Sequence, residues 1–173
     1  MDIQVITIGN ENLAKKSLPV KEINDDIRNI CKAMLDIVHE KKGIGLAAPQ
    51  VDILQRFFVV HIENDVPRVF INPSIISTSE EVVTFEEGCL SVPGIWSDVV
   101  RPKKVIVQAW NENGKAFTQE ASGLLARVIL HEYDHLEGLL FVERVSEVKK
   151  SKLLAKYEKV KCKNEKKKNK KRV

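Results

Sequence analysis

The stretch His131-Glu132-Tyr133-Asp134-His135 is the starting point for interpreting this 173-residue chain. Apolar residues precede it at three- and four-residue steps, which is the period of an amphipathic helix. On such a helix His131 and His135 share one face about 5–6 Å apart, so both imidazoles can reach one metal ion at about 2.0–2.1 Å. Glu132 lies beside that face, where a carboxylate can act as a general base. The stretch therefore predicts a helix that carries two metal ligands and a base.

The same pentapeptide can also arise by chance on the surface of a helix that binds no metal. The whole chain holds only four histidines, and two of them fall in this motif, which favours the functional interpretation. His61 lies in a segment that reads as a strand. We expect it to be a strand or surface residue and not a ligand.

The third ligand has to come from elsewhere, because a catalytic zinc-type site uses three protein ligands and keeps one position open. The spacing from His131 to Gly138 matches the metzincin proteases, but the third histidine of that pattern would fall at Phe141. Glu158 would complete a thermolysin-like set, yet it lies in a basic segment that is poorly placed to reach the core. Cys89 is the better candidate, since it follows a glycine in a predicted loop and thiolate binds divalent transition metals well.

Composition and length predict one globular domain in a reducing compartment. Hydrophobic residues make up 43% of the chain, and no apolar run approaches the roughly 20 residues that span a bilayer. The N-terminus lacks the basic and apolar regions of a signal peptide, so we expect the protein to stay where it is made. The three cysteines are an odd, sparse set that does not indicate a disulfide framework. Of these, Cys31 falls on a predicted buried stripe and Cys162 in the C-terminal segment.

Charge divides the chain into two parts. Residues 149–173 hold 13 Lys and Arg and two acids, a net charge of +11, whereas residues 1–148 hold 15 basic and 22 acidic residues, a net charge of −7. We therefore predict a catalytic domain over residues 1–148 and a basic C-terminal helix and tail over residues 149–173. From Lys161 onward the sequence is too charged to pack, and we expect it to fray or be disordered.

The expected elements follow from periodicity and turn signals. They are a helix over residues 21–42 ended by Gly43, extended segments between residues 55 and 102, a hairpin over residues 104–120 around Asn113-Gly114, the motif helix from about residue 122, and a last helix from about residue 146. The extended segments are residues 56–62, 69–76 and 80–86. A loop over residues 87–94, which carries Cys89, follows them.

Three stretches together resemble the signature motifs of the peptide deformylase family, in the family's order and with similar separations. They are Gly43-Ile44-Gly45-Leu46-Ala47-Ala48-Pro49-Gln50, Glu87-Gly88-Cys89-Leu90-Ser91 and the stretch from His131 to His135. The resemblance runs from the first helix to about Arg144, and the lysine-rich C-terminal helix is similar to that of the type 1 bacterial enzymes. Leu130 stands where many members have glutamine, and Trp96 stands where several have a basic residue.

The resemblance implies an enzyme that removes the N-formyl group from the N-terminal methionine of newly synthesised proteins and releases formate. Cys89, His131 and His135 would bind one divalent metal ion, Fe(II) in many members, with zinc or nickel substituting. A metal-bound water would be the nucleophile. Glu132 would take its proton and deliver it to the leaving amine.

The resemblance also assigns residues to the oxyanion and to the peptide. The Gln50 amide and the Leu90 backbone N–H would stabilise the oxyanion. The backbone of Gly43-Ile44-Gly45 would pair with an extended peptide, as in strand addition. Leu124 and Val128 would help to wall the pocket for the methionine side chain.

The implied fold is α+β, with antiparallel β-sheets surrounding a central metal-binding helix, an N-terminal helix and a C-terminal helix. Glu87 and Arg101 resemble a family ion pair that holds the cysteine loop. The implied partners are nascent N-formyl-Met peptides and, through the basic tail, the ribosome, in the bacterial cytoplasm and without membrane or DNA. The rivals are a metalloprotease and an RNA- or ribosome-binding module with a structural metal. The latter is disfavoured because structural zinc has four ligands and only three are found.

Overall fold

The computed structural model describes residues 3–170 of the chain, with the side chains of residues 3–167. The α-helices are α1 (Asp25–Glu40), α2 (Gly123–Leu136) and α3 (Glu147–Lys170), and short 3-10 helices are η1 (Glu11–Ala14), η2 (Ala48–Val51) and η3 (Phe141–Arg144). The strands are β1 (Gly45–Ala47), β2 (Phe57–Val60), β3 (Arg68–Thr78), β4 (Val82–Cys89), β5 (Val92–Pro102), β6 (Lys104–Trp110) and β7 (Ala116–Ser122). Five strands form one sheet in the order β1-β2-β3-β6-β7, and β4 pairs with β5 in a second sheet.

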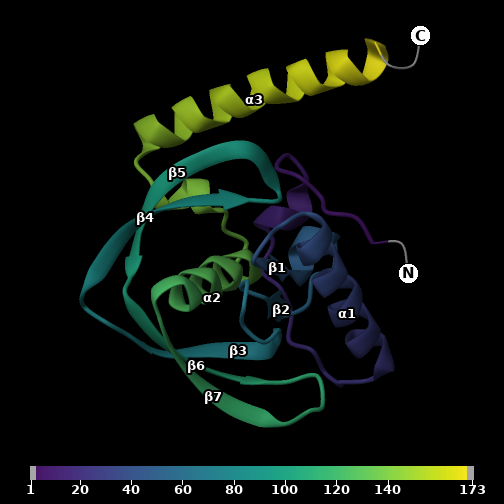
Figure 1. Cartoon of the computed structure of the whole chain (residues 1–173), viewed down its shortest axis with the longest axis vertical. Coiled ribbons are helices and arrows are strands. Elements are labelled where there is room, and N and C mark those ends of the chain that lie inside the picture. The colour runs from purple at the N-terminus through teal and green to yellow at the C-terminus, as the bar shows by residue number, and fades with distance from the viewer. Residues whose placement is uncertain (1–2, 171–173) are drawn as a thin grey trace.

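The five-stranded sheet lies between α1 and α2 (Figure 1). Successive side chains of a strand point to opposite faces, so Phe57 and Val59 of β2 pack toward α1, whereas Phe58 and Val60 pack toward α2. All four are fully buried. This is why β2 reads as a continuous apolar run instead of an alternating one.

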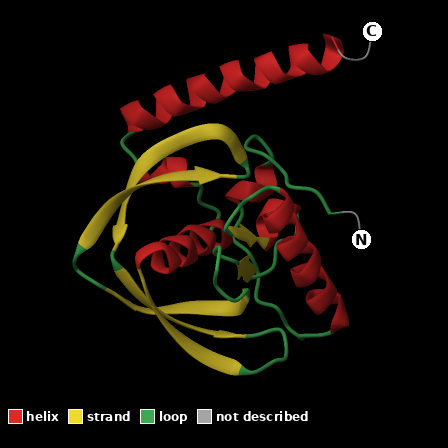
Figure 2. Cartoon of the chain, in the orientation of Figure 1, coloured by secondary structure: helices red, strands yellow, loops and turns green. Residues whose placement is uncertain are grey.

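The two-stranded sheet encloses α2 from another side, and α3 lies outside it (Figure 2). Val92, Ile95 and Val99 of β5 pack with Phe141 of η3 and Tyr157 of α3 in a separate apolar cluster. All strand pairs are antiparallel. The predicted α+β fold, with antiparallel sheets around a central helix, is therefore confirmed. No helix of the described residues has the length and apolar character needed to cross a membrane.

The first helix ends at Glu40, two residues before the expected end at residue 42. Lys41 caps α1, and Lys42 takes the left-handed conformation with φ 54°. Gly43 itself makes room for a neighbour, since a Cβ there would lie 3.3 Å from the Leu90 side chain. The prediction that Gly43 supplies the helix stop was wrong in its residue, because a lysine accepts the left-handed turn.

Cys89 lies at the end of a strand and not in the predicted loop of residues 87–94. β4 continues through Cys89, and β5 begins at Val92 after a two-residue connection. The strand can continue because Gly88 pairs with Trp96, and a Cβ at Gly88 would lie 2.6 Å from the Trp96 ring. The glycine that reads as a loop signal instead lets an indole lie across the strand.

The C-terminal helix is longer than predicted. We expected residues from Lys161 onward to fray, but α3 continues to Lys170; residues 171–173 lie outside the described part. Packing stops near Val160, whose Cγ1 lies 3.1 Å from the place of a Cβ on Gly94. Beyond that contact the side chains of residues 161–167 are exposed, and the high helix propensity of lysine and glutamate supports the helix.

Candidate active site

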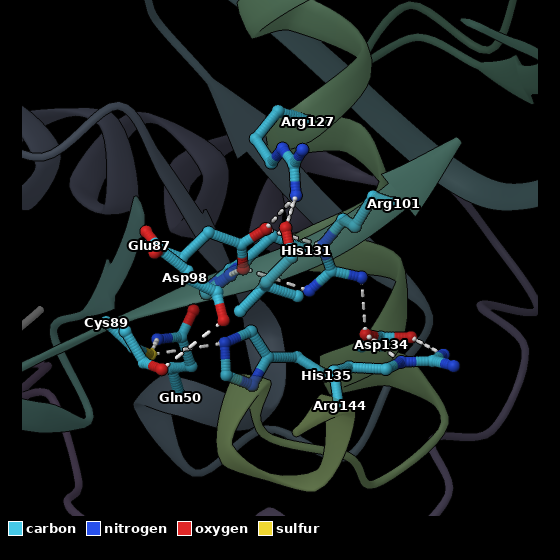
Figure 3. Close-up of polar contacts among 12 residues, drawn as sticks. Gln50, Glu87, Cys89, Asp98, Arg101, Arg127, His131, Asp134, His135 and Arg144 are labelled. Atoms are coloured by element: carbon cyan, nitrogen blue, oxygen red, sulfur yellow. Dashed lines mark hydrogen bonds and ion pairs between the residues drawn. The ribbon is translucent and has the colours of Figure 1, made fainter. Parts of the chain in front are cut away.

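The motif helix α2 starts directly after β7, with Ser122 as its N-cap. Because α2 is enclosed by both sheets, the side of the helix that carries the motif is buried: Glu132 is 4% exposed and His135 is 1% exposed. The end of β4 meets this side and brings Cys89 to it. One ligand atom each of Cys89, His131 and His135 lies within 4.8 Å of the others (Figure 3). The structure thus brings together the three residues predicted to bind a metal.

The donor set fits a divalent transition metal. The Cys89 Sγ lies 3.4 Å from the His135 Nε2. The His131 Nδ1 donates to the Glu87 carboxylate at 2.9 Å, which leaves Nε2 with its lone pair. Metal-binding histidines usually have such a partner on the second ring nitrogen. Among the described residues, the buried Glu132 Oε2 has no hydrogen-bond partner, as expected of a group that awaits a water or a substrate.

Burial and hydrogen bonds together set the pKa values of the two glutamates beside this cluster. It raises the pKa of Glu132 to about 7, which neighbouring His131 offsets only in part. Burial also opposes ionisation of Glu87, but the hydrogen bonds from His131 and Arg101 outweigh it and hold the pKa of Glu87 well below its usual range. Glu87 is therefore a fixed negative charge behind His131, whereas burial favours the protonated form of Glu132.

Gln50 is fixed in one orientation by η2. Its Oε1 accepts a hydrogen bond from the Ala47 backbone N–H at 2.8 Å. The amide nitrogen therefore faces the cluster, 3.3 Å from the Cys89 Sγ and 3.2 Å from the Ser91 Oγ. Gln50 is 2% exposed, so its NH₂ group is a buried donor held beside the proposed ligand.

A cavity of about 670 Å³ opens in front of Cys89, His131 and Glu132. Gly43, Ile44 and Gly45 form part of its wall, and Gln50, Leu90, Leu124 and Val128 also line it. All residues predicted to bind the metal, the oxyanion or the peptide, and the predicted base, line this cavity except His135. Gly45 has no room for a side chain, because a Cβ there would lie 2.6 Å from the Glu132 Oε1 and 2.8 Å from Val128.

A buried network that the sequence revealed only in part holds α2 against the two-stranded sheet. The expected pair is present: the Arg101 Nε donates to Glu87 at 2.6 Å. Arg127 joins it unexpectedly. Its guanidinium donates to Glu87 at 3.0 Å, to the Val99 carbonyl at 2.8 Å and to the Val83 carbonyl at 2.6 Å. Arg127 precedes His131 by four residues and so shares its helix face, a signal that could have identified it.

Asp134 extends the network on the other side of Arg101. It accepts a hydrogen bond from the Arg101 Nη1 at 2.8 Å and from the Arg144 Nε at 2.9 Å. Asp134 lies within the central motif, but its tertiary partners come from β5 and η3. Sequence spacing alone gives no indication of them.

Comparison with known proteins shows the family of the chain. The family model for polypeptide deformylase matches residues 3–151. A peptide deformylase of Borreliella burgdorferi is 46% identical over 157 residues, 90% of this chain and 94% of the relative. One from Neisseria meningitidis is 44% identical over 159 residues, 91% of this chain and 95% of the relative.

Solved structures give the same result. A peptide deformylase from Legionella pneumophila superposes with a TM-score of 0.89 at 36% identity, covering 95% of this chain and 98% of that one. One from Synechococcus elongatus in complex with actinonin has a TM-score of 0.85 at 40% identity, covering 89% and 86%. The chain belongs to the peptide deformylase family, hydrolases that remove the formyl group from the N-terminal methionine of proteins.

Proposed function

We propose that Cys89, His131 and His135 hold the single divalent metal ion with which this chain removes N-formyl groups. The observation that carries the proposal is the convergence of a thiolate and two imidazoles within 4.8 Å, beside a buried carboxylate. Imidazole and thiolate ligands suit iron, nickel and zinc; we infer Fe(II) as the native metal, with zinc or nickel as substitutes. When bound, such an ion lowers the pKa of a coordinated water and polarises the formyl carbonyl.

Glu132 is the proposed catalytic base. Its Oε2 takes a proton from the attacking water and then delivers it to the nitrogen of the leaving methionine, so that one carboxyl group serves both halves of the reaction. The buried, unpartnered Oε2 supports this role. Gly45 leaves the carboxylate open to the cavity, since no side chain stands between them.

Gln50 and Leu90 are the proposed donors to the oxyanion that forms at the formyl carbon. The Gln50 NH₂ group faces the cluster because its oxygen is held by Ala47. Leu90 follows Cys89 directly, and its backbone N–H is the second proposed donor. Donors that are fixed before the reaction stabilise developing charge without reorganisation.

The peptide is proposed to bind along β1. This strand is at the edge of the five-stranded sheet, so Gly43-Ile44-Gly45 can pair with an extended chain by strand addition. The methionine side chain would enter the cavity against Leu124 and Val128. Ile44 and Leu124 are 39% and 42% exposed, and a bound peptide would cover this apolar surface.

We also infer two units of function within the chain. Residues 1–148 form the catalytic domain, and the tail, residues 149–173, carries a net charge of +11 that is suited to the phosphates of ribosomal RNA. The family match ends at residue 151, which supports this division. Docking at the ribosome would bring the enzyme to nascent formyl-Met peptides in the bacterial cytoplasm.

The decisive experiment compares two substrates and two ways of purifying the enzyme. Enzyme purified without oxygen and enzyme purified in air are assayed for metal content, and for formate release from formyl-Met-Ala-Ser per bound metal. We expect one equivalent of formate per free amine and no cleavage of an internally quenched, unblocked peptide. Cleavage of the unblocked peptide would indicate a protease, and activity without bound metal would overturn the proposed site.

A further inference from the structure

The two remaining histidines meet on the surface, outside the catalytic cavity. His39 is exposed in the last turn of α1, and half-buried His61 directly follows β2. The two ring centroids are 4.6 Å apart, and the His39 Nε2 faces the His61 Nδ1. The two residues are 22 positions apart in the chain, and their contact joins the end of α1 to the end of β2.

A backbone carbonyl selects the tautomer of the His61 ring. Its Nε2 lies 3.0 Å from the backbone carbonyl oxygen of Asp65. A carbonyl only accepts, so Nε2 carries the hydrogen and Nδ1 of the neutral ring has a lone pair directed at His39. Metal-ligating histidines share this arrangement, in which one nitrogen binds the ion and the other donates to a carbonyl or a carboxylate.

We propose that His39 and His61 form a second cation site, which takes a divalent ion of the Zn²⁺, Ni²⁺ or Cu²⁺ class. These ions prefer imidazole nitrogen. A tetrahedral ion with bonds of about 2.0–2.1 Å holds two nitrogens about 3.3 Å apart, and exposed His39 can turn to reach that separation. The Asp65 carboxylate is engaged by Arg68 at 2.7 Å, so water would complete the coordination.

The position of the pair connects it to the substrate cleft. The His61 backbone N–H donates to the Ile44 carbonyl at 2.9 Å, and the Gly43 N–H donates to the Val38 carbonyl at 2.8 Å. The segment between these anchors, residues 41–44, lines the cavity. A cation bound by both His39 and His61 would therefore restrict the movement of residues 41–44 at both ends of the segment. This consequence for the peptide rests on the proposed function, whereas the cation site does not.

Equilibrium dialysis of the holoenzyme against Zn²⁺, with elemental analysis, tests the site. The Cys162→Ser background removes the exposed thiol on α3 as a competing ligand. We expect the parent to bind one zinc equivalent beyond the catalytic metal. In both His39→Ala and His61→Ala, the affinity for this second equivalent should fall at least about 10-fold. Asp36→Asn, exposed on α1 one turn before His39, is the matched control and should bind as the parent does.

Two results would overturn the site. The first is that the parent binds no second zinc equivalent, which would leave the pair as a hydrogen bond between the two rings. The second is that His39→Ala binds the second zinc equivalent as tightly as the parent does. Zinc-dependent shifts of the His39 Nε2 and His61 Nδ1 resonances in ¹⁵N spectra test the folded parent without any histidine substitution. The link to the cleft has its own measurement. Zinc at the second site should lower KM for formyl-Met-Ala-Ser in the parent but not in His39→Ala, and an equal KM would refute the link while the stoichiometry stands.

Discussion

At the scale of single residues, Glu132 is the group whose chemistry is most open to test. Glu132→Gln keeps nearly the same volume in the buried site but removes the basic oxygen. We expect full metal content and a loss of turnover of about 10²–10⁴-fold, which is the usual contribution of general acid–base catalysis. Metal analysis and formate release on the same sample separate the two effects. A variant that keeps more than about a tenth of the activity would show that Glu132 is not the base.

A substitution at Gly45 tests how closely the proposed base, Glu132, is packed. A methyl group at this position would lie 2.6 Å from the Glu132 Oε1 and 2.8 Å from the Val128 Cγ1, so both side chains have to move. We expect Gly45→Ala to lower kcat at least about 10-fold, because small displacements of a catalytic group are costly. Gly43→Ala, at a residue proposed to pair with the peptide, is the comparison in kcat alone. Its Cβ would meet the flexible end of Leu90 at 3.3 Å and the Val38 carbonyl oxygen at an ordinary contact distance of 3.8 Å. Equal rates for the two variants would contradict this account.

The three cysteines should react with a thiol reagent in a fixed order. Cys162 is exposed, Cys89 is a proposed ligand, and Cys31 is buried. Burial, aided by the negative charge of Glu112, raises the pKa of Cys31 to about 12. Its reactive thiolate is therefore scarce at pH 8, far below that pKa.

We expect the metal-loaded enzyme at pH 8 to react quickly with a disulfide reagent at Cys162 and to release one equivalent of chromophore. Cys89 should react only after a chelator removes the metal, and Cys31 only in denaturant. Peptide mapping of the labelled sites identifies each cysteine. Fast labelling of Cys89 in the metal-loaded enzyme would argue against its role as a ligand.

At the scale of elements, Arg127 joins α2 to the two-stranded sheet through Glu87 and two backbone carbonyls. Arg127→Met keeps the apolar stem but leaves the carbonyls of Val83 and Val99 without this donor. We expect the free energy of unfolding to fall by about 1–3 kcal/mol, the usual cost of an unsatisfied buried polar group. Denaturant titration of the metal-loaded enzyme measures this change.

Arg144→Met is the matched control for that measurement. The Arg144 side chain is 45% exposed, and its partner Asp134 keeps the bond from Arg101. We expect the control to lose less stability than Arg127→Met does, because Arg144 is partly exposed and Asp134 keeps its bond from Arg101. If both variants lose the same stability, Arg127 does not have the special clamping role inferred from its contacts.

Only the local part of this site could be predicted from the sequence. The spacing of His131 and His135 is local to one helix, so it could be predicted without any knowledge of the sheets. Cys89 could be proposed only by elimination and by resemblance, because its place beside α2 depends on how β4 folds back. The partners of Arg127 and the meeting of His39 with His61 depend on tertiary packing, to which a single sequence gives no access.

At the scale of the whole molecule, the tail combines a packed part and a charged part. Leu153, Tyr157 and Val160 of α3 pack in the cluster under β5. Residues 161–173 hold eight Lys and Arg and one Glu, a net charge of +7, and the described side chains among them are exposed. A truncation after Val160 therefore removes charge and keeps the packing.

We expect the truncated enzyme to retain its activity on a free formyl-Met peptide and its stability, because cavity and core remain intact. Its cosedimentation with ribosomes should become weaker and less dependent on salt, since fewer phosphate-bound counterions are released. A full-length chain with the same eight basic residues changed to Gln separates charge from length and should behave as the truncation does. If the truncated chain cosediments as well as the full-length chain at every salt concentration, the basic tail is only a solvated end that aids solubility. In that case the enzyme would have to meet its substrates by diffusion.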